Sequence, residues 1–191
     1  ENARRYIAKT YDTVDEAIKD SFLSYQREVV PLYSELNDNL DRKYLASPAR
    51  PSLPGRYELF DRRRKTKAEL FRKENTRLET EDTELHAKYM EIQGAITVEI
   101  DGETLTPQQC AALLEKPDRE LREKAFRKLA ERRLQDRNKI EELFDQQLAI
   151  RHQVALNAGY ENYRDYRFQE LCRFDYGPGD CAAFHTAVEE I

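Results

Sequence analysis

The chain has 191 residues, of which 39% are hydrophobic and 36% are charged, and only 6 glycines and 7 prolines interrupt it. So few turn residues exclude an all-β sandwich, and the charge density favours long amphipathic helices with solvated outer faces. The net charge of −5 gives no general attraction to phosphate backbones, and the sequence contains no run of about 20 apolar residues that could span a membrane. We therefore expect neither a nucleic acid nor a membrane as a partner.

The three cysteines, Cys110, Cys172 and Cys181, cannot all pair with one another, and none belongs to a C-x-x-C motif. They are predicted to be reduced thiols, which are typical of the cytoplasm, and no signal-peptide pattern opens the sequence. We therefore predict a cytoplasmic localisation. The chain starts without Met and stops at Ile191 inside an amphipathic pattern, so both ends are expected to be cut.

The first predicted helix begins with a capping box, Thr13-x-x-Glu16, and its apolar positions repeat at helical spacing up to Val29. Pro31 is expected to kink or restart this helix, because proline has no N–H to donate. The same apolar stripe then continues through Leu32, Tyr33, Leu36 and Leu40.

The stretch 47–55 contains three prolines and a glycine, so it is predicted to be a loop between helices and the best internal boundary. This divides the chain into residues 1–56, an N-terminal helical segment with the proline-rich loop, and residues 57–191, a helical lobe with a β-hairpin. We expect the two parts to be continuous as one domain that is truncated at its C-terminus.

A strongly charged helix is predicted over residues 57–73, with a break near Asn75, since Asn and Thr compete for backbone hydrogen bonds. The next helix is expected to carry acidic residues at its beginning, where the helix dipole favours them, and to end at Gly94. These acidic residues are Glu81, Asp82 and Glu84.

The one clear β signal covers about residues 95–105. Ile96, Val98 and Ile100 alternate onto one face, and Asp101-Gly102 tolerates the positive φ angles of a two-residue turn. We predict a single small hairpin whose apolar face packs against helices, because an isolated hairpin is only marginally stable in water.

Helix signals fill the rest of the sequence. Thr106-Pro107-x-Gln109 combines a cap, a proline at the first helical position and a capping-box partner, and it predicts a short helix. Pro117-Asp118 then opens the longest predicted helix, straight or bent, which Gly159 closes.

Two shorter helices are predicted to follow, capped by Asn162 and Asp180 and separated by a turn over residues 173–179. The predicted fold class is therefore mainly α: a multi-helix lobe with long antiparallel helices and one small β-hairpin.

The sequence contains three histidines, and none lies in H-E-x-x-H, the helical arrangement that places two imidazoles beside a glutamate base. His185 and Glu189 share a helix face, but two ligands fall short of the three or four that zinc requires. Cys181 has the same spacing from His185, and we prefer a packing role for it over that of a nucleophile. His86 and His152 are interpreted as helix-surface or boundary residues. We therefore predict no catalytic, metal-binding or cofactor-binding residue in this chain.

The run Arg62-Arg63-Arg64-Lys65 is the only local concentration of positive charge. Several glutamates follow it, so we interpret it as part of a solvated helix face with mixed charges. RNA binding through this run is a less favoured alternative, which predicts an affinity that falls steeply with salt.

Several segments, in the correct order, resemble the oligoendopeptidase F group of the thimet-oligopeptidase-like zinc metallopeptidases. They are residues 85–95 running into the hairpin at 97–103, the stretch 117–125, the stretch 148–166 (LAIRHQVALNAGYENYRDY), and the turn Arg173-Phe174-Asp175-Tyr176 followed by Asp180. The stretch 148–166 is the closest, and the resemblance is good over residues 80–191 and mainly architectural before that.

In that group, an H-E-x-x-H helix and a downstream glutamate hold zinc, and the H-E-x-x-H glutamate acts as general base on the zinc-bound water. None of these elements has a counterpart here, so the resemblance assigns no catalytic residue to this chain. It implies a helical N-terminal lobe that forms one wall of a deep channel for short peptides. The hairpin and the turn at 173–179 are then structural parts of that wall.

The sequence thus predicts the N-terminal, non-catalytic part of a zinc-dependent oligopeptidase that hydrolyses internal bonds of short peptides. Zinc is expected in the full-length protein and not in this chain, which is expected to be inactive by itself. Its expected partners are short peptides, the missing catalytic lobe and a second copy in a homodimer, formed through apolar surface left uncovered. The alternative is a stand-alone helical scaffold or interaction protein without catalysis.

Overall fold

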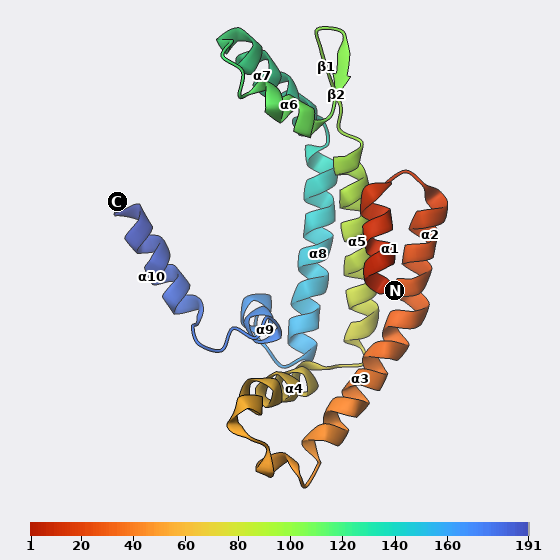
Figure 1. Ribbon diagram of the computed structural model, residues 1–191, viewed down its shortest axis with the longest axis vertical. Helices are drawn as coiled ribbons and strands as arrows, with labels where there is room; N and C mark the ends of the chain where they lie inside the picture. The colour runs from red at the N-terminus through yellow and green to blue at the C-terminus, as the bar shows by residue number, and fades with distance from the viewer. Residues whose placement is uncertain (191) are drawn as a thin grey trace. The chain divides into compact units, whose positions relative to one another are not determined.

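The computed structural model describes residues 1–190 and confirms the predicted fold class, mainly α with one small antiparallel hairpin (Figure 1). The α-helices of this part of the chain are α1 (Asn2–Tyr11), α2 (Glu16–Ser24), α3 (Val30–Leu45), α4 (Glu58–Leu70), α5 (Asn75–Gly94), α6 (Pro107–Leu113), α7 (Arg119–Gln135), α8 (Arg137–Asn157), α9 (Tyr163–Glu170) and α10 (Pro178–Glu189). The strands are β1 (Val98–Ile100) and β2 (Glu103–Leu105), and the short helical turns are η1 (Tyr25–Val29), η2 (Arg50–Ser52) and η3 (Gly55–Tyr57). Over residues 1–190, no helix combines the length and the apolar composition that crossing a membrane requires.

The chain folds into two compact units. Unit 1 contains residues 1–23 and 83–147, and unit 2 contains residues 24–82 and 148–190. Helices α5 and α8 therefore each contribute residues to both units.

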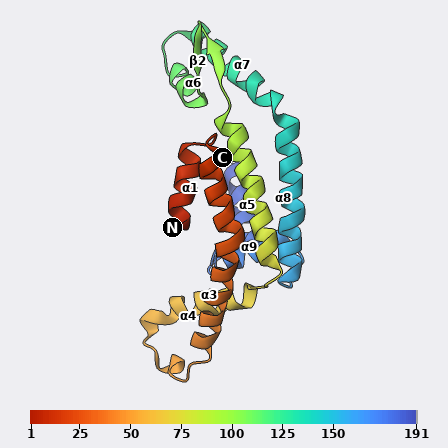
Figure 2. The same cartoon turned by 90° about the vertical axis from the view of Figure 1, so that its right-hand side faces the viewer.

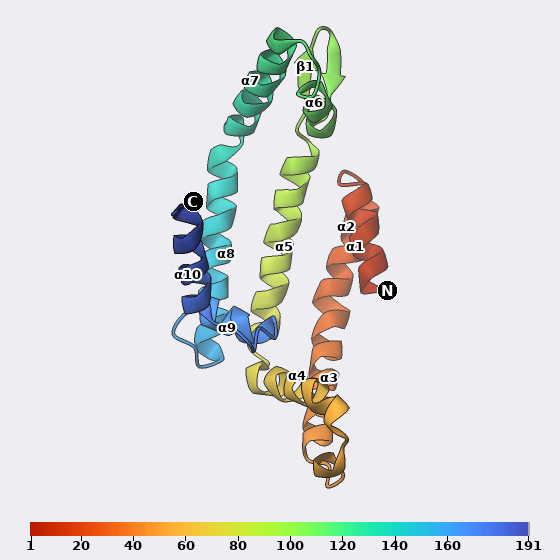
Figure 3. The ribbon, with the colours of Figure 1, turned by 60° about the vertical axis from the view of Figure 1, so that its left-hand side comes forward.

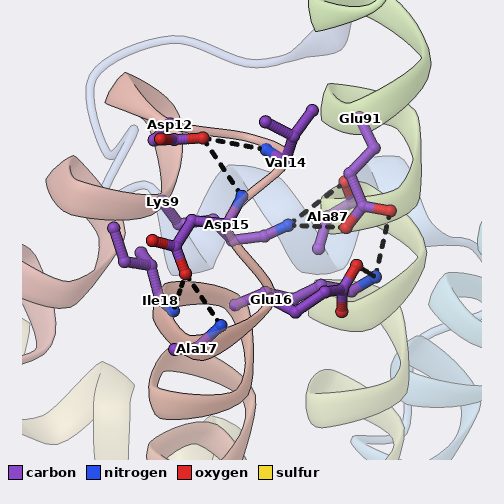
Figure 4. Close-up of polar contacts among 10 residues, drawn as sticks. Lys9, Asp12, Val14, Asp15, Glu16, Ala17, Ile18, Ala87 and Glu91 are labelled. Carbon is purple, nitrogen blue, oxygen red and sulfur yellow. Dashed lines mark hydrogen bonds and ion pairs between the residues drawn. The ribbon is translucent and has the colours of Figure 1, made fainter.

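Unit 1 begins with α1 and α2, which a tight turn connects. Asp15 caps α2, since its Oδ1 accepts hydrogen bonds from the backbone N–H groups two and three residues further on, at 2.8 and 3.1 Å. Asp12 Oδ1 accepts two more backbone N–H groups of the turn, both at 3.1 Å (Figure 4). The predicted capping box at Thr13 is therefore wrong, because Thr13 lies inside the turn that these two aspartates organise.

A buried ion pair joins α1 and α2 to α5 (Figure 4). The Lys9 side chain is only 5% exposed, and its ammonium lies 3.0 Å from Glu91 Oε1 and 3.4 Å from the carbonyl oxygen of Ala87. Lys19 of α2 lies 3.3 Å from the other carboxylate oxygen of Glu91. Burial alone raises the pKa of Glu91, but the two ammonium groups lower it below its ordinary value. One carboxylate thus neutralises cations from two other helices.

The hairpin of unit 1 has the predicted turn. Asp101 and Gly102 have φ angles of 54° and 85°, the positive values that a two-residue turn of this type requires. The register of the two strands pairs Val98 with Leu105, Glu99 with Thr104, and Ile100 with Glu103.

The apolar face of the hairpin packs against helices, also as predicted. Val98 and Ile100 form a buried cluster with Cys110 of α6 and Ala125 of α7, and Figure 2 shows these two helices close to the strands. This contact supplies the burial that a two-stranded sheet needs in order to be stable.

The helices that follow the hairpin start at their predicted caps. Thr106 Oγ1 accepts the N–H of Gln109 at 3.3 Å, Gln109 Oε1 accepts the N–H of Thr106 at 2.8 Å, and Asp118 caps α7. The long helix predicted after Asp118 is bent: α7 gives way to α8 at Asp136, whose carboxylate accepts a hydrogen bond from Arg132 Nη1 at 2.5 Å.

In unit 2, Pro31 interrupts the helix as predicted. The chain widens before it into one π-helical turn, η1, in which the N–H of Val30 donates to the carbonyl of Tyr25. Because proline has no N–H and its ring crowds the carbonyl four residues earlier, the wider turn accommodates it. The proline-rich stretch forms η2 and η3 and connects α3 to α4, as predicted.

The core of unit 2 contains residues of α4, α8 and α9, and Figure 3 shows α9 beside α8. Its buried members are Leu70, Val154, Ala155, Ala158 and Tyr166. Asn75, only 2% exposed, begins α5; its Nδ2 donates to the carbonyl of Val154 at 3.0 Å, and its Oδ1 accepts from Asn157 Nδ2 at 2.7 Å. The predicted break therefore lies just before Asn75.

Two predicted helix starts are corrected. Because the buried hydrogen bonds of Asn75 begin α5 early, Glu81, Asp82 and Glu84 lie within the helix and not at its N-terminus. Asp180 lies in the first turn of α10 and does not cap it from outside; its Oδ2 accepts the N–H of Gly177 at 2.7 Å. Asn162, in contrast, caps α9 as predicted, accepting the N–H of Asp165 at 3.0 Å.

The buried ion pair of unit 1 gives a first prediction. Replacing Glu91 with Gln keeps the shape of the side chain but leaves the buried Lys9 ammonium without its counter-charge, so we expect the free energy of unfolding to fall by about 2–4 kcal/mol. Urea denaturation followed by circular dichroism measures this. The matched control is Glu123→Gln, because Glu123 pairs with Arg127 at 2.7 Å with both side chains mostly exposed; its cost is expected to stay below about 0.5 kcal/mol. Equal costs for the two variants would contradict the prediction.

The turn of the hairpin gives a second prediction. Gly102 has a φ of 85°, so Gly102→Ala forces an L-residue into the left-handed region and is expected to cost about 1–2 kcal/mol. Gly55→Ala is the control, since a Cβ there meets nothing within 4 Å and the backbone angle is ordinary; we expect a change within about 0.5 kcal/mol. Thermal unfolding compares the two, and a neutral Gly102→Ala would rule out the positive φ.

Candidate functional site

Unit 2 contains a cavity of about 250 Å³. Side chains of α3, α4 and α9, together with the start of α5, border it. The lining residues are Tyr33, Ser34, Asn37, Asp38, Asp41, Thr66, Lys67, Leu70, Phe71, Arg72, Glu79, Tyr166, Gln169, Glu170 and Cys172.

Two aspartates of α3 form the acidic side of the cavity, and both are buried. Asp41 forms an ion pair with Arg64 of α4. One oxygen of Asp38, Oδ2, lies 2.7 Å from Arg42 Nε, whereas the other, Oδ1, is buried without a hydrogen-bond partner among the described residues. A buried acceptor without a donor is destabilising, so a donor brought next to Asp38 Oδ1 would stabilise the site.

Among the carboxyl groups of the lining, that of Glu79 on α5 has a strongly shifted pKa. The pKa of its carboxyl is raised to about 7, mainly by desolvation and further by the nearby carboxylate of Glu170. Desolvation also raises the pKa of the Tyr166 phenol, and the carboxylates of Glu170 and Glu79 add to the effect. Near neutral pH, Glu79 therefore exists in both its protonated and its ionised form.

The oxygens of the lining indicate which kind of ligand the cavity could bind. Its carboxylate and amide oxygens suit a ligand that donates hydrogen bonds or carries positive charge. Cys172 is the only thiol of the lining, and no histidine lies there to act as its base.

In the structure, the three histidines do not come together in one site. His86 stacks near Tyr89, with ring centroids 6.2 Å apart, and His152, His185 and Glu189 are exposed on their helices. Over residues 1–190, no three His, Cys, Asp or Glu side chains are arranged to hold a metal ion. The residues present thus do not fit a zinc ion, and we assign no step of a metal-assisted reaction to them.

The three cysteines are free thiols. Cys110 is buried in the core of unit 1, where desolvation raises its pKa. Cys172 follows α9 with a φ of 55° and lines the cavity, and Cys181 is partly exposed on α10.

Part of the basic run on α4 is used within unit 2. The guanidinium of Arg62 lies 4.1 Å from the ring centroid of Phe174, Arg64 binds Asp41, and Lys65 lies 3.8 Å from Glu69. These side chains therefore contribute to packing and ion pairs of the fold.

Sequence reasoning did not single out the cavity. Its signal in the sequence is the pair Asp38 and Asp41, which lies on the opposite side of α3 from the apolar stripe. Two acidic residues three positions apart usually indicate a solvated face, so their burial could not be deduced from spacing alone.

Comparisons with known proteins found one matching family model and several solved structures with the same fold. Residues 112–190 match the sequence profile of Peptidase family M3, whereas no curated protein sequence matches the chain. Solved structures with the same fold include PZ peptidase A with an inhibitor (TM-score 0.89, 24% identity) and a protein assigned as oligoendopeptidase F from Bacillus anthracis str. Ames (TM-score 0.87, 18% identity). A further structure assigned as oligoendopeptidase F has a TM-score of 0.89 and 22% identity.

The similarity covers nearly all of this chain but a minor part of those proteins. The aligned regions comprise 96–97% of this chain and 33–34% of the other chains, so this chain spans about a third of their length. The family match and the shared fold confirm the resemblance predicted from the sequence.

The Glu79 carboxyl predicts a pH dependence of stability. Its pKa is raised from 4.5 to about 7 in the folded chain, so the unfolded chain ionises first as pH rises, and stability falls between about pH 4.5 and 7. A fully buried carboxyl would make the loss about 3 kcal/mol. Because Glu79 is exposed, solvent screening reduces the expected loss to roughly 1 kcal/mol or less.

Urea unfolding of the wild type and of Glu79→Gln at pH 5 and pH 8 measures this loss. The variant should be more stable than the wild type at pH 8, and this advantage should be smaller at pH 5. The exposed Glu74→Gln serves as control and should show no such difference between the two pH values. An identical pH dependence for Glu79→Gln and the wild type would contradict the raised pKa.

Proposed function

We propose that this chain, a relative of the M3 peptidases by sequence match and fold, is the non-catalytic N-terminal part of a zinc-dependent oligopeptidase. In this proposal it forms one wall of a channel that admits short peptides, whose internal bonds the complete enzyme hydrolyses. The observation that carries the proposal is the match of residues 112–190 to Peptidase family M3 on a fold that solved oligoendopeptidases share.

In the stretch that most resembles the oligoendopeptidases, several residues are buried in the core of unit 2, which supports a structural role for this stretch. In the stretch 148–166, Val154 and Ala155 are 4% and 0% exposed, and Tyr166 is 4% exposed in the same core. Gly159 has a φ of 89°, which allows α8 to end there and the chain to turn toward α9. These positions preserve packing and chain direction.

The turn at 173–179 is also held by contacts within unit 2. Arg62 of α4 lies over the ring of Phe174, and the guanidinium of Arg173 lies 5.0 Å from the ring centroid of Phe168 and 5.9 Å from that of Tyr176. Cation–π contacts of this kind fix the turn to α4 and α9. This supports the proposal that the turn, like the hairpin of unit 1, is a structural part of the channel wall.

The zinc-binding residues and the general base are proposed to lie in a part of the enzyme outside residues 1–191. There the metal would activate a water molecule and polarise the peptide carbonyl. The residues of this chain would shape the channel and exclude folded proteins. The three free thiols support the cytoplasm as the compartment in which the enzyme works.

Activity measurements test this function. We expect the 191-residue chain to show no turnover of fluorogenic short peptides with added zinc. The longer gene product that contains it should cleave the same peptides, lose the activity with a chelator and regain it with zinc.

Two results would contradict the proposal. Chelator-sensitive turnover by the chain alone would show that a complete site exists in it. A gene product that ends near residue 191, or a longer product without metal-dependent turnover, would instead favour the stand-alone helical scaffold.

A further inference from the structure

Helix α3 buries acidic residues within unit 2 and exposes its leucines, the reverse of the usual arrangement. Its buried residues are Asp38 and Asp41, at 9% and 4% exposure, and they face the cavity and α4. The leucines of the same helix are exposed: Leu32, Leu36 and Leu40 at 64%, 62% and 60%. A helix that needed only its own unit would bury the leucines and expose the acids.

The exposed apolar residues form one continuous stripe. With 100° between successive residues of an α-helix, they fall within about 100° of one another around the axis. We call them the α3 stripe, whose members are Val29, the last residue of η1, and Leu32, Tyr33, Leu36 and Leu40 of α3. Between Val29 and Leu40 no charged residue lies in this sector. An uncharged stripe about 16 Å long is the face that a helix presents to another apolar surface.

The length of the related proteins indicates what covers the α3 stripe. Proteins with this fold continue for about twice the length of this chain outside the matched third. The stripe is exposed and uncharged, so an apolar face of that further polypeptide would complement it.

We infer that the α3 stripe is the docking surface for the catalytic lobe of the same polypeptide, which covers it with an apolar face. This inference rests on the proposed function and deepens it, because it names the residues through which the wall is joined to the rest of the enzyme. It also explains why α3 buries two aspartates. Its apolar side packs against the other lobe, so its acidic side faces the cavity and α4, where ion pairs with Arg42 and Arg64 compensate the charges of Asp38 and Asp41.

Site-specific labelling in the longer gene product tests the docking. Leu36→Cys and Leu40→Cys place thiols on the stripe, and Asn39→Cys, exposed on the same helix but outside the stripe, is the matched control. Reaction with a maleimide, quantified for each peptide by mass spectrometry, should be at least tenfold slower at positions 36 and 40 than at 39. The ratio should not change on dilution. Equal rates would overturn the inference.

A photo-crosslinking amino acid at position 36 identifies the occupant. We expect cross-links to residues of the same polypeptide outside 1–191. Cross-links to a second copy, recognised by mixing isotope-labelled and unlabelled protein, or to residues 1–190 of the same copy, would overturn the catalytic lobe as the occupant.

The two proposals fail in different ways. Protected thiols in a protein without metal-dependent turnover would refute the proposed function and leave the docking intact. Reactive thiols in an active, chelator-sensitive enzyme would refute the docking alone.

Discussion

The buried amide of Asn75 ties the start of α5 to the last turns of α8, and the core of unit 2 is arranged around this contact. Its donor satisfies the carbonyl of Val154, and its acceptor takes a hydrogen from Asn157 at 2.7 Å. Arg72 adds a second link, with Nε 3.0 Å from the carbonyl oxygen of Asn157. Because buried polar groups are costly unless they are paired, these bonds select one register between the two helices.

That register determines which side chains meet in unit 2. It brings Val154, Ala155 and Ala158 against Leu70 and Tyr166, and these residues belong mainly to the stretch that most resembles the oligoendopeptidases. Within that stretch, these residues pack the core of unit 2, and Gly159 lies where α8 ends. Buried packing positions of this kind are what the proposed role as a channel wall requires.

Helix α3 packs within unit 2 and still leaves an apolar face exposed to water. Its acids are compensated by arginines, as in the pair of Asp41 with Arg64, while the leucines remain in contact with water. Exposed leucines give up the free energy of burial, about 1.5–3 kcal/mol for each side chain, which a covering lobe would recover. The acidic cavity and the α3 stripe are thus two consequences of one orientation of the helix.

The sequence alone determined the features that depend on neighbouring residues. Asp101-Gly102 specified the hairpin and its two-residue turn, Thr106 with Gln109 specified a capping box, and Asn162 specified the start of α9, because each uses hydrogen bonds or backbone angles within four residues. The mainly α fold class followed from the same local signals.

Only the tertiary structure decided which polar groups are buried. Lys9 pairs with Glu91 across 82 residues, and Asn75 donates to Val154 across 79 residues, so the burial of these groups could not be deduced from the residues nearby. The same holds for Asp38 and Asp41, whose spacing looks like that of a solvated face. Periodicity shows that a helix has two faces, but which face is covered depends on elements distant in the chain, since burial is a property of the packed whole.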